Sequence, residues 1–282
     1  MCTHEKKFDN IIDAWLCALG DYFYFGRFAS DATSLSDGIQ DMYRELVSRA
    51  GINARSKVLA VGWGIGELEF SIHEMTGCDV RRVYHDEARI EIARERCKEK
   101  GYDRRVRFET ATSIIGHFPD NHFDVVLAFE SSVFFSDKAE FIADIWRILR
   151  KGGRLVFADT MLQRALTLAD VFYDFREEML ALERTWGKMK MEPFDNYRKN
   201  MERSRFCNIV ADNVSDQVFP TLAKWKQTAI SNRNKLEEVL SNEKIDAFLR
   251  TCDIMQKFFK DDFYCYGILT GDKSSESLAS ES

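Results

Sequence analysis

Three glycines at alternate positions, Gly62, Gly64 and Gly66, are the residues of this chain whose types and spacing point most directly to chemistry. They follow the apolar run Val58–Val61, which indicates a buried strand that ends in a tight turn. Glycine has no Cβ and tolerates positive φ, so the backbone of such a turn can approach a ligand closely. A helix that begins after the turn would direct its unpaired N–H groups to the same place. The layout predicts a nucleotide-like cofactor at the carboxyl edge of a parallel sheet, against Gly62, Trp63, Gly64 and Gly66.

Strands and helices alternate on both sides of this turn. Apolar runs and segments of helical periodicity follow one another with short connections. This repetition implies right-handed crossovers and a parallel sheet covered on both faces. The sequence therefore predicts an α/β fold, a doubly wound and mostly parallel sheet of about seven strands with N-terminal helices and a helical cap. The expected strands are 57–62, 80–85, 105–110, 123–129, 154–159, 206–214 and 262–270, and the expected helices are 7–19, 35–50, 66–76, 87–100, 138–150, 216–239 and 242–258.

The alternation breaks after residue 160, which suggests how the chain is divided. The following stretch is mostly helical in pattern and rich in Met, Leu, Trp and Phe, whereas the last residues are rich in Ser and Glu. The predicted parts are an N-terminal helical lid (1–50), an α/β core of cofactor-binding type (51–160), a helical cap insert (161–205), the C-terminal part of the core (206–272) and a disordered tail (273–282).

Composition excludes several classes of protein. The net charge is −6 with acidic and basic residues mixed along the chain, which argues against a nucleic-acid partner. No apolar run approaches the roughly 20 residues of a membrane span, and the first residues do not resemble a signal segment. The seven cysteines form no Cys-x-x-Cys pair and the five histidines lack metal-ligand spacing. We expect reduced thiols, a cytoplasmic protein and no metal site.

Five further segments resemble known motifs and follow one another along the chain: Leu19–Gly26, Phe118–Asp124, Phe129–Ser131, Leu149–Leu155 and Phe263–Thr270. Together with the glycine loop, they resemble the motifs of class I S-adenosylmethionine (SAM) methyltransferases over about residues 10–272. The chain is similar, more narrowly, to the group that contains tocopherol, sarcosine and macrolide- or indolocarbazole-sugar methyltransferases. The resemblance implies a Rossmann-like fold, SAM as cofactor and a small-molecule acceptor. It also implies that Phe129 and Glu130 lie at the site.

The chain departs from this family's pattern where polar anchors are expected. Ala60 stands in place of an acid before the glycine loop, Tyr84 in place of the ribose carboxylate, Thr112 in place of the adenine-binding Asp, Phe134 in place of a His base and Tyr24 in place of a His in the lid. Hydrogen bonds from hydroxyl groups to a carboxylate contribute roughly 1.5–3 kcal/mol each. The substitutions therefore predict that SAM is bound weakly or that its binding is lost.

Several of these residues also have plain structural interpretations. The glycines could form a turn without a ligand, although ligand contact is the preferred interpretation. Asp86 fits a helix N-cap better than a displaced ribose acid. Tyr24 could close a lid or only attach the N-terminal helix. Trp186 and Trp225 are better explained as core of the cap than as substrate contacts.

Three functions follow, in order of preference. The first is methyl transfer from SAM to a small, largely apolar metabolite, at carbon or an activated oxygen, with Tyr24, Glu130 and Phe134 near the reacting atoms. The second is a SAM-independent cyclase or isomerase that stabilises cationic intermediates on aromatic faces such as those of Tyr24, Phe134 and Phe135. The third is a silent subunit. The sequence leaves open a homodimer or a methyltransferase partner.

Overall fold

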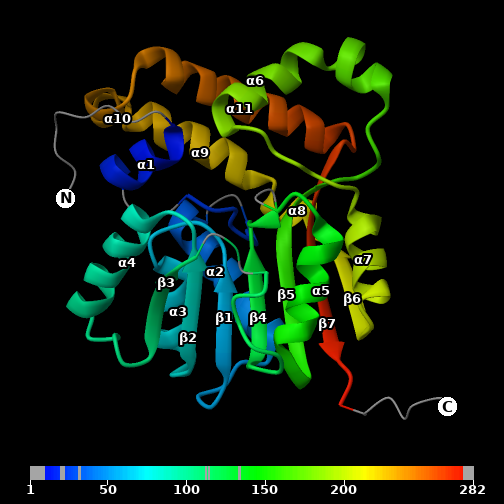
Figure 1. Ribbon diagram of the computed structural model, residues 1–282. Coiled ribbons are helices and arrows are strands. Elements are labelled where there is room, and N and C mark those ends of the chain that lie inside the picture. The colour runs from blue at the N-terminus through cyan, green and yellow to red at the C-terminus, as the bar shows by residue number, and fades with distance from the viewer. Residues whose placement is uncertain are drawn as a thin grey trace. The chain divides into compact units, whose positions relative to one another are not determined.

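A seven-stranded sheet organises the computed structural model, which describes residues 10–19, 23–30, 33–111, 113, 115–132 and 135–275 (Figure 1). The strand order is β3-β2-β1-β4-β5-β7-β6, with parallel pairing from β3 to β5 and antiparallel pairing between β6 and β7. The strands are β1 (Lys57–Val61), β2 (Asp79–Tyr84), β3 (Val106–Thr110), β4 (Phe123–Phe129), β5 (Leu149–Leu162), β6 (Phe206–Asn213) and β7 (Tyr264–Lys273). The predicted α/β fold with a mostly parallel sheet is confirmed.

Helices connect these strands at most of the predicted positions. They are α1 (Ile11–Leu19), α2 (Leu35–Ala50), α3 (Glu67–Thr76), α4 (Glu87–Glu99), α5 (Lys138–Ile148), the π-helical turn η2 (Asp170–Asp174), α6 (Arg176–Trp186), α7 (Phe194–Arg203), α8 (Ser215–Val218), α9 (Pro220–Ser231), α10 (Arg233–Val239) and α11 (Asn242–Lys260). The prediction for the fifth strand, 154–159, was too short. That strand begins at Leu149, which pairs with Phe123, so β4 extends it through the Gly152–Gly153 turn.

The chain divides into two compact units, and each is described by itself. Unit 2 comprises Tyr43–Thr160, Phe194–Asn213 and Gly267–Ser282, and unit 1 comprises Met1–Met42, Met161–Pro193 and Val214–Tyr266. In unit 2, α3 packs on β2 and β3, α4 packs on β3, and α7 lies between α5 and β6. The predicted boundaries of lid, core, cap and tail stay a prediction. Residues 276–282 of the predicted tail lie outside the described residues.

The centre of unit 2 explains where a site can form. Val58, Leu59 and Ala60 of β1 are fully buried, as expected for a parallel strand covered on both faces. The register pairs β1 with β2 on one side and with β4 on the other. The carboxyl ends of these three strands therefore meet at one edge of the sheet, where Gly62 follows β1, Glu130 follows β4 and Tyr84 is the last residue of β2.

Unit 1 is built around aromatic side chains rather than a sheet. The ring of Phe23 stacks on that of Trp225, with centroids 4.7 Å apart and planes at 4°. Phe248 is fully buried and contacts this stack edge-on or tilted. We call Trp15, Phe23, Phe25, Trp186, Trp225 and Phe248 the aromatic cluster. The preferred interpretation of Trp186 and Trp225 as packing residues agrees with these contacts.

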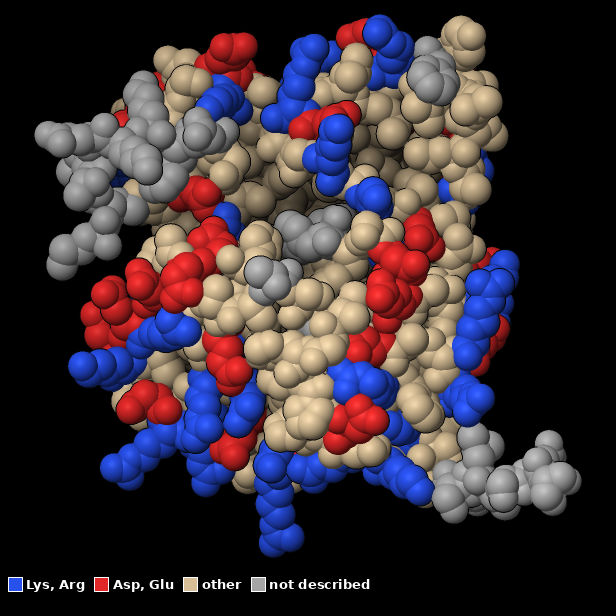
Figure 2. Space-filling model, in the orientation of Figure 1, with Lys and Arg blue, Asp and Glu red and all other residues tan. Residues whose placement is uncertain are grey.

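Charged side chains of both signs are scattered over the face seen in Figure 2 around a largely uncharged centre, with Lys and Arg gathered along its lower margin. Lys57, Arg81, Arg104, Arg105 and Arg107 line a pocket of about 210 Å³ at the edge where β1–β3 begin. Two acidic side chains, Asp79 and Glu109, pair with arginines of this group. Among the described residues, no helix is long and apolar enough to cross a membrane.

Most of the cysteines that the structure describes carry free thiols. Cys78, Cys97, Cys252 and Cys265 are buried and free, and Cys207 is exposed and free. Burial raises the pKa of the Cys97 thiol to about 11, so it stays protonated at neutral pH. Cys17 is disulfide-bonded, so the expectation of reduced thiols is wrong for this residue.

Candidate cofactor site

The glycine loop, Gly62–Gly66, turns the chain from β1 into α3 through backbone conformations that favour glycine. Gly64 has φ 94° and Gly66 has φ 111°, both in the left-handed region. Gly62 is needed for a different reason, because a Cβ there would lie 2.9 Å from the carbonyl oxygen of Phe129. Gly66 is also the N-cap of α3 and offers no side chain to its first N–H groups. The loop therefore presents bare backbone at the sheet edge.

A cavity of about 270 Å³ adjoins this loop. It combines apolar walls with a few polar groups, as ligand sites do, and its volume lies near the lower end of such sites, roughly 300 Å³. The cavity is lined by Val61, Gly62, Val83, Tyr84, His85, Ala111, Ser113, Ile115, Ser131, Phe135, Ser136, Asp137 and Glu140. Two predicted site residues, Gly62 and Tyr84, are thus brought together.

Tyr84 stands at the cavity wall that the family's pattern gives to a carboxylate. Its ring lies 4.4 Å from the ring of His85 and 5.4 Å from the guanidinium carbon of Arg82. Two carboxylates line the cavity from another element, Asp137 and Glu140 at the start of α5. Asp137 accepts a hydrogen bond from the Glu140 amide at 2.9 Å and so caps the helix. Sequence reasoning missed both, although an Asp before a helix is a recognisable N-cap signal.

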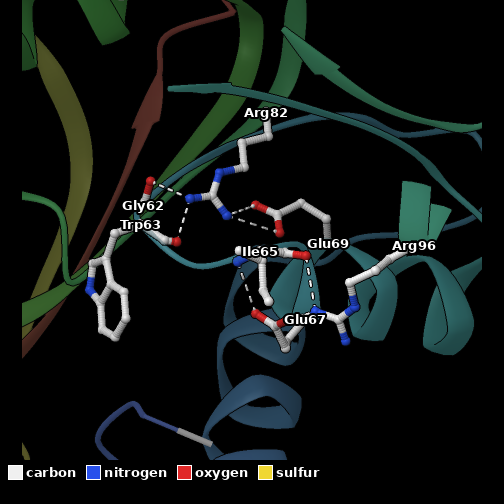
Figure 3. Close-up of polar contacts among 7 residues, drawn as sticks. All are labelled: Gly62, Trp63, Ile65, Glu67, Glu69, Arg82 and Arg96. Carbon is white, nitrogen blue, oxygen red and sulfur yellow. Dashed lines mark hydrogen bonds and ion pairs between the residues drawn. The ribbon is translucent and has the colours of Figure 1, made fainter. Parts of the chain in front are cut away.

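Two arginine–glutamate pairs hold the glycine loop, and in each pair the arginine donates to a backbone carbonyl oxygen of the loop (Figure 3). Arg82 of β2 and Glu69 of α3 form an ion pair at 3.3 Å, and both side chains are almost fully buried. Arg82 also donates to the carbonyl oxygens of Gly62, at 2.8 Å, and Trp63. Arg96 of α4 pairs with Glu67 and donates to the carbonyl of Ile65 at 3.1 Å, but a quarter of its side chain is exposed.

Glu130 follows β4 in a strained conformation. Its φ of 46° lies in the left-handed region, which costs a residue with a side chain about 1 kcal/mol or more. Its amide donates to the carbonyl of Ala158 at 2.8 Å, so β5 holds the strained residue in place. The side chain is buried. Strain at a strand end beside a cavity is typical of a functional residue, and the catalytic role of Glu130 stays a prediction.

A polar network lies beside Glu130 at the end of β5. The Asp159 carboxylate accepts from the amides of Ser132 and Thr160, both at 2.8 Å, and the Tyr197 hydroxyl contacts the Ser132 hydroxyl at 3.0 Å. Burial raises the pKa of the Asp159 carboxyl to about 6, although these donors and the charge of Lys138 oppose the shift. The network fixes the chain that leaves β4 at the cavity.

Comparison with known proteins identifies the family. Residues 59–157, which include the glycine loop and β4, match the model of a methyltransferase domain. The chain is 30% identical over 192 residues to the methyltransferase GfsG of Streptomyces halstedii, covering 68% of this chain and 67% of that protein. The chain belongs to the class I SAM-dependent methyltransferases.

Two other similarities extend over almost the whole length of this methyltransferase. It is 24% identical over 268 residues to 27-O-demethylrifamycin SV methyltransferase of Amycolatopsis mediterranei, covering 95% of this chain and 96% of the relative. Its fold matches the crystal structure of the [4+2]-cyclase SpnF with a TM-score of 0.78 at 17% identity, covering 95% and 94% of the two chains. At that identity the match concerns the fold alone.

The methyltransferase's residues fit SAM in part. The bare loop, the uncapped start of α3 and the cavity beside them provide close backbone approach and hydrogen-bond donors. The side chains of β2, in contrast, supply Tyr84 rather than a carboxylate to the cavity. The fit therefore depends on backbone and aromatic contacts more than on charge.

The remaining predicted residues lie in different places. Trp63 is buried in the glycine loop, and Phe129 is buried at the end of β4 beside Gly62. Tyr24 is buried in unit 1. Asp86 is the N-cap of α4 and accepts from the Arg89 amide at 3.2 Å, which confirms the structural interpretation. Thr112 and Phe134 lie outside the described residues, and the roles of all these residues stay predictions.

Proposed function

We propose that this enzyme transfers a methyl group from SAM to a small, largely apolar metabolite of specialised metabolism. The observation that carries the proposal is the cavity formed jointly by the glycine loop, Tyr84 and Ser131 in a chain of this family. Full-length similarity to an enzyme that methylates a demethylrifamycin supports a metabolite of that general size and apolarity as acceptor.

The chain's own residues would bind and orient rather than supply strong acid or base catalysis. When bound, SAM supplies an electrophilic methyl group on its sulfonium sulfur. Gly62, Trp63, Gly64 and Gly66 would contact it through backbone, while Tyr84, Thr112 and Phe129 would contact its nucleoside part. Glu130, Tyr24 and Phe134 would shape the reaction centre. Holding the acceptor in line with the methyl group can supply much of the rate enhancement.

Calorimetric titration with SAM and S-adenosylhomocysteine (SAH) tests the proposal. We expect measurable but weak binding, because the nucleoside contacts at positions 84 and 112 lack charge. Gly62→Ala should abolish it, since the new methyl group would meet the Phe129 carbonyl at 2.9 Å. Gly153→Ala is a matched control, because its Cβ would also lie 2.9 Å from a backbone carbonyl, that of Arg150, and Gly153 does not line the cavity.

Equal losses of affinity in the two glycine variants would show that the loop has no special relation to the cofactor. No binding of SAM or SAH by the native enzyme at millimolar ligand would overturn methyl transfer.

SAM-independent cyclisation is the second candidate, favoured by the neutral residues at positions where the family carries anchors. The full-length match in fold to a [4+2]-cyclase makes such chemistry compatible with this architecture. Turnover of a polyene by the isolated chain, unchanged when SAM is withheld, would support it. Turnover that stops without SAM would support methyl transfer instead.

We also propose that the enzyme works in the cytoplasm, as a homodimer or with a methyltransferase partner. The buried free thiols of Cys78, Cys97, Cys252 and Cys265 favour a reducing compartment, whereas the disulfide at Cys17 counts against it. Cell fractionation tests the compartment. Sedimentation of the purified chain, alone and with a candidate partner, tests the assembly.

A further inference from the structure

Arg82 contacts the glycine loop, α3 and Tyr84 at once. Its side chain is 2% exposed and lies against Glu69, which is 1% exposed. A buried arginine needs both a counter-charge and partners for its remaining N–H groups. Glu69 supplies the charge and accepts from Nη1, and the carbonyls of Gly62 and Trp63 both accept from Nη2 (Figure 3).

The position of Arg82 is directly linked to the missing acid. Arg82 is the register partner of Ala60 across the β1–β2 pair, so both side chains point to the same face of the sheet. Ala60 is fully buried, and its methyl side chain offers no polar group to the loop. The guanidinium of Arg82 reaches the loop from the neighbouring strand instead.

The same guanidinium lies 5.4 Å from the centre of the Tyr84 ring, within the range of a cation–π contact. Tyr84 lines the cavity, and so does Gly62, whose carbonyl Arg82 holds. One planar group with several donors thus connects two parts of the cavity wall. A lysine ammonium is a point charge and cannot reproduce this fork of contacts.

We propose that Arg82, charge-balanced by Glu69, is a positioning residue that fixes the glycine loop and Tyr84 for cofactor binding, in place of a carboxylate at position 60. The proposal rests on the proposed function for its cofactor. A cation on β2 and a carboxylate on α3 would together hold the loop in its conformation.

The test compares the full-length enzyme with Arg82→Lys, with the double variant Arg82→Met/Glu69→Met, and with the control Arg81→Lys. Arg81 is on the same strand but on the other face, where it pairs loosely with Glu109 at 3.6 Å. Replacing both partners of a buried pair by apolar residues often preserves stability, so the double variant should fold. Arg82→Lys keeps the charge and provides a second route if the double variant does not fold.

Two readouts are needed: hydrogen–deuterium exchange of the amides between Gly62 and Glu67, and the dissociation constant of SAH. We expect exchange in this segment to accelerate about tenfold or more in both Arg82 variants, and SAH affinity to fall by a similar factor. Thermal unfolding of the folded variants should change much less than loop exchange. Arg81→Lys should match the native enzyme in every readout.

Unchanged loop exchange in either Arg82 variant would overturn the proposal whatever happens to SAH. Faster loop exchange with unchanged SAH affinity would reduce Arg82 to a structural role and also overturn it. If the native enzyme binds no SAH although its loop is well protected, the proposed function fails, and faster exchange in the variants then confines Arg82 to holding the loop.

Discussion

The glycine loop of unit 2 and the aromatic cluster of unit 1 are both mostly buried, but different contacts hold them. The loop is fixed by directional polar contacts, chiefly those of Arg82 and Glu69. The cluster is fixed by ring packing, such as the stack of Phe23 on Trp225. The free energy gained by burying apolar rings is roughly proportional to the buried area and tolerates small shifts. A hydrogen-bonded ion pair, in contrast, depends on geometry and leaves a buried charge when one partner is removed. The loop should therefore govern ligand geometry, and the cluster should govern stability.

The largest effect is expected in the aromatic cluster. Phe248→Ala should lower the free energy of unfolding by about 3–5 kcal/mol, because it leaves a cavity among Trp15, Phe23 and Trp186. Urea unfolding measures this loss, and Phe248→Leu should lose only about 1 kcal/mol. The variant that remains folded should bind SAH as the native enzyme does. A tenfold loss of SAH affinity in folded Phe248→Ala would show that the aromatic cluster also governs ligand geometry.

The polar network around Asp159 in unit 2 should make the free energy of unfolding depend on pH, whereas the aromatic cluster should not. The pKa of Asp159 is raised to about 6 in the folded state, above its ordinary value of 3.8. An acid with a raised folded pKa stabilises the fold most below its unfolded pKa, and this contribution is lost as the pH rises through about 6. The difference between the two pKa values of Asp159 corresponds to about 3 kcal/mol in the free energy of unfolding.

Urea unfolding of the native enzyme and Asp159→Asn between pH 4 and pH 7.5 checks this expectation. The stability of the native enzyme relative to the variant should fall across the interval. Comparing the two proteins cancels carboxylates with the opposite shift, such as Glu178, whose pKa Lys257 lowers. A constant difference between the two proteins would show that Asp159 titrates normally.

The two arginine–glutamate pairs at the loop differ in burial, and their variants should differ accordingly. Glu69→Gln should lower stability by about 2 kcal/mol and weaken SAH binding, because it removes the counter-charge of an arginine that is 2% exposed. Glu67→Gln should have a smaller effect on both, since Arg96 is 25% exposed and water can solvate it. Thermal unfolding and calorimetry of the two variants measure the contrast. Equal effects would mean that burial does not distinguish the pairs.

The sequence was sufficient for those parts of the fold that depend on local pattern. The strand at 123–129 was predicted with the bounds of β4, and the helix at 35–50 with those of α2, because long apolar or periodic runs carry their own signal. The fifth strand was predicted too short because Gly152 and Gly153 indicate a turn locally. Pairing with β4, a contact distant in sequence, decides their conformation.

The site was predictable where its residues form a sequence motif or stand at a position of the family's pattern, as Tyr84 does. The three glycines are visible as a motif, whereas Arg82 acts through Glu69, 13 residues away, and through the glycine loop, 19 and 20 residues away. Its role depends on the β1–β2 register, which no local pattern contains. One signal was available: Arg82 shares a strand face with Val80 and Tyr84, so a charge at that position of a buried strand requires a partner.

The smallest effect is expected at an exposed ion pair of unit 1. Lys226 of α9 contacts both carboxylate oxygens of Asp253 of α11, at 2.6 and 2.7 Å, which is shorter than the 3.3 Å between Arg82 and Glu69. Yet the two side chains are 35% and 55% exposed, so water competes for both charges. Asp253→Asn should therefore change the free energy of unfolding by only about 0.5 kcal/mol, less still in 1 M salt. A loss as large as that of Glu69→Gln in matched urea titrations would show that distance rather than burial sets the strength of these pairs, and would contradict the role proposed for Arg82.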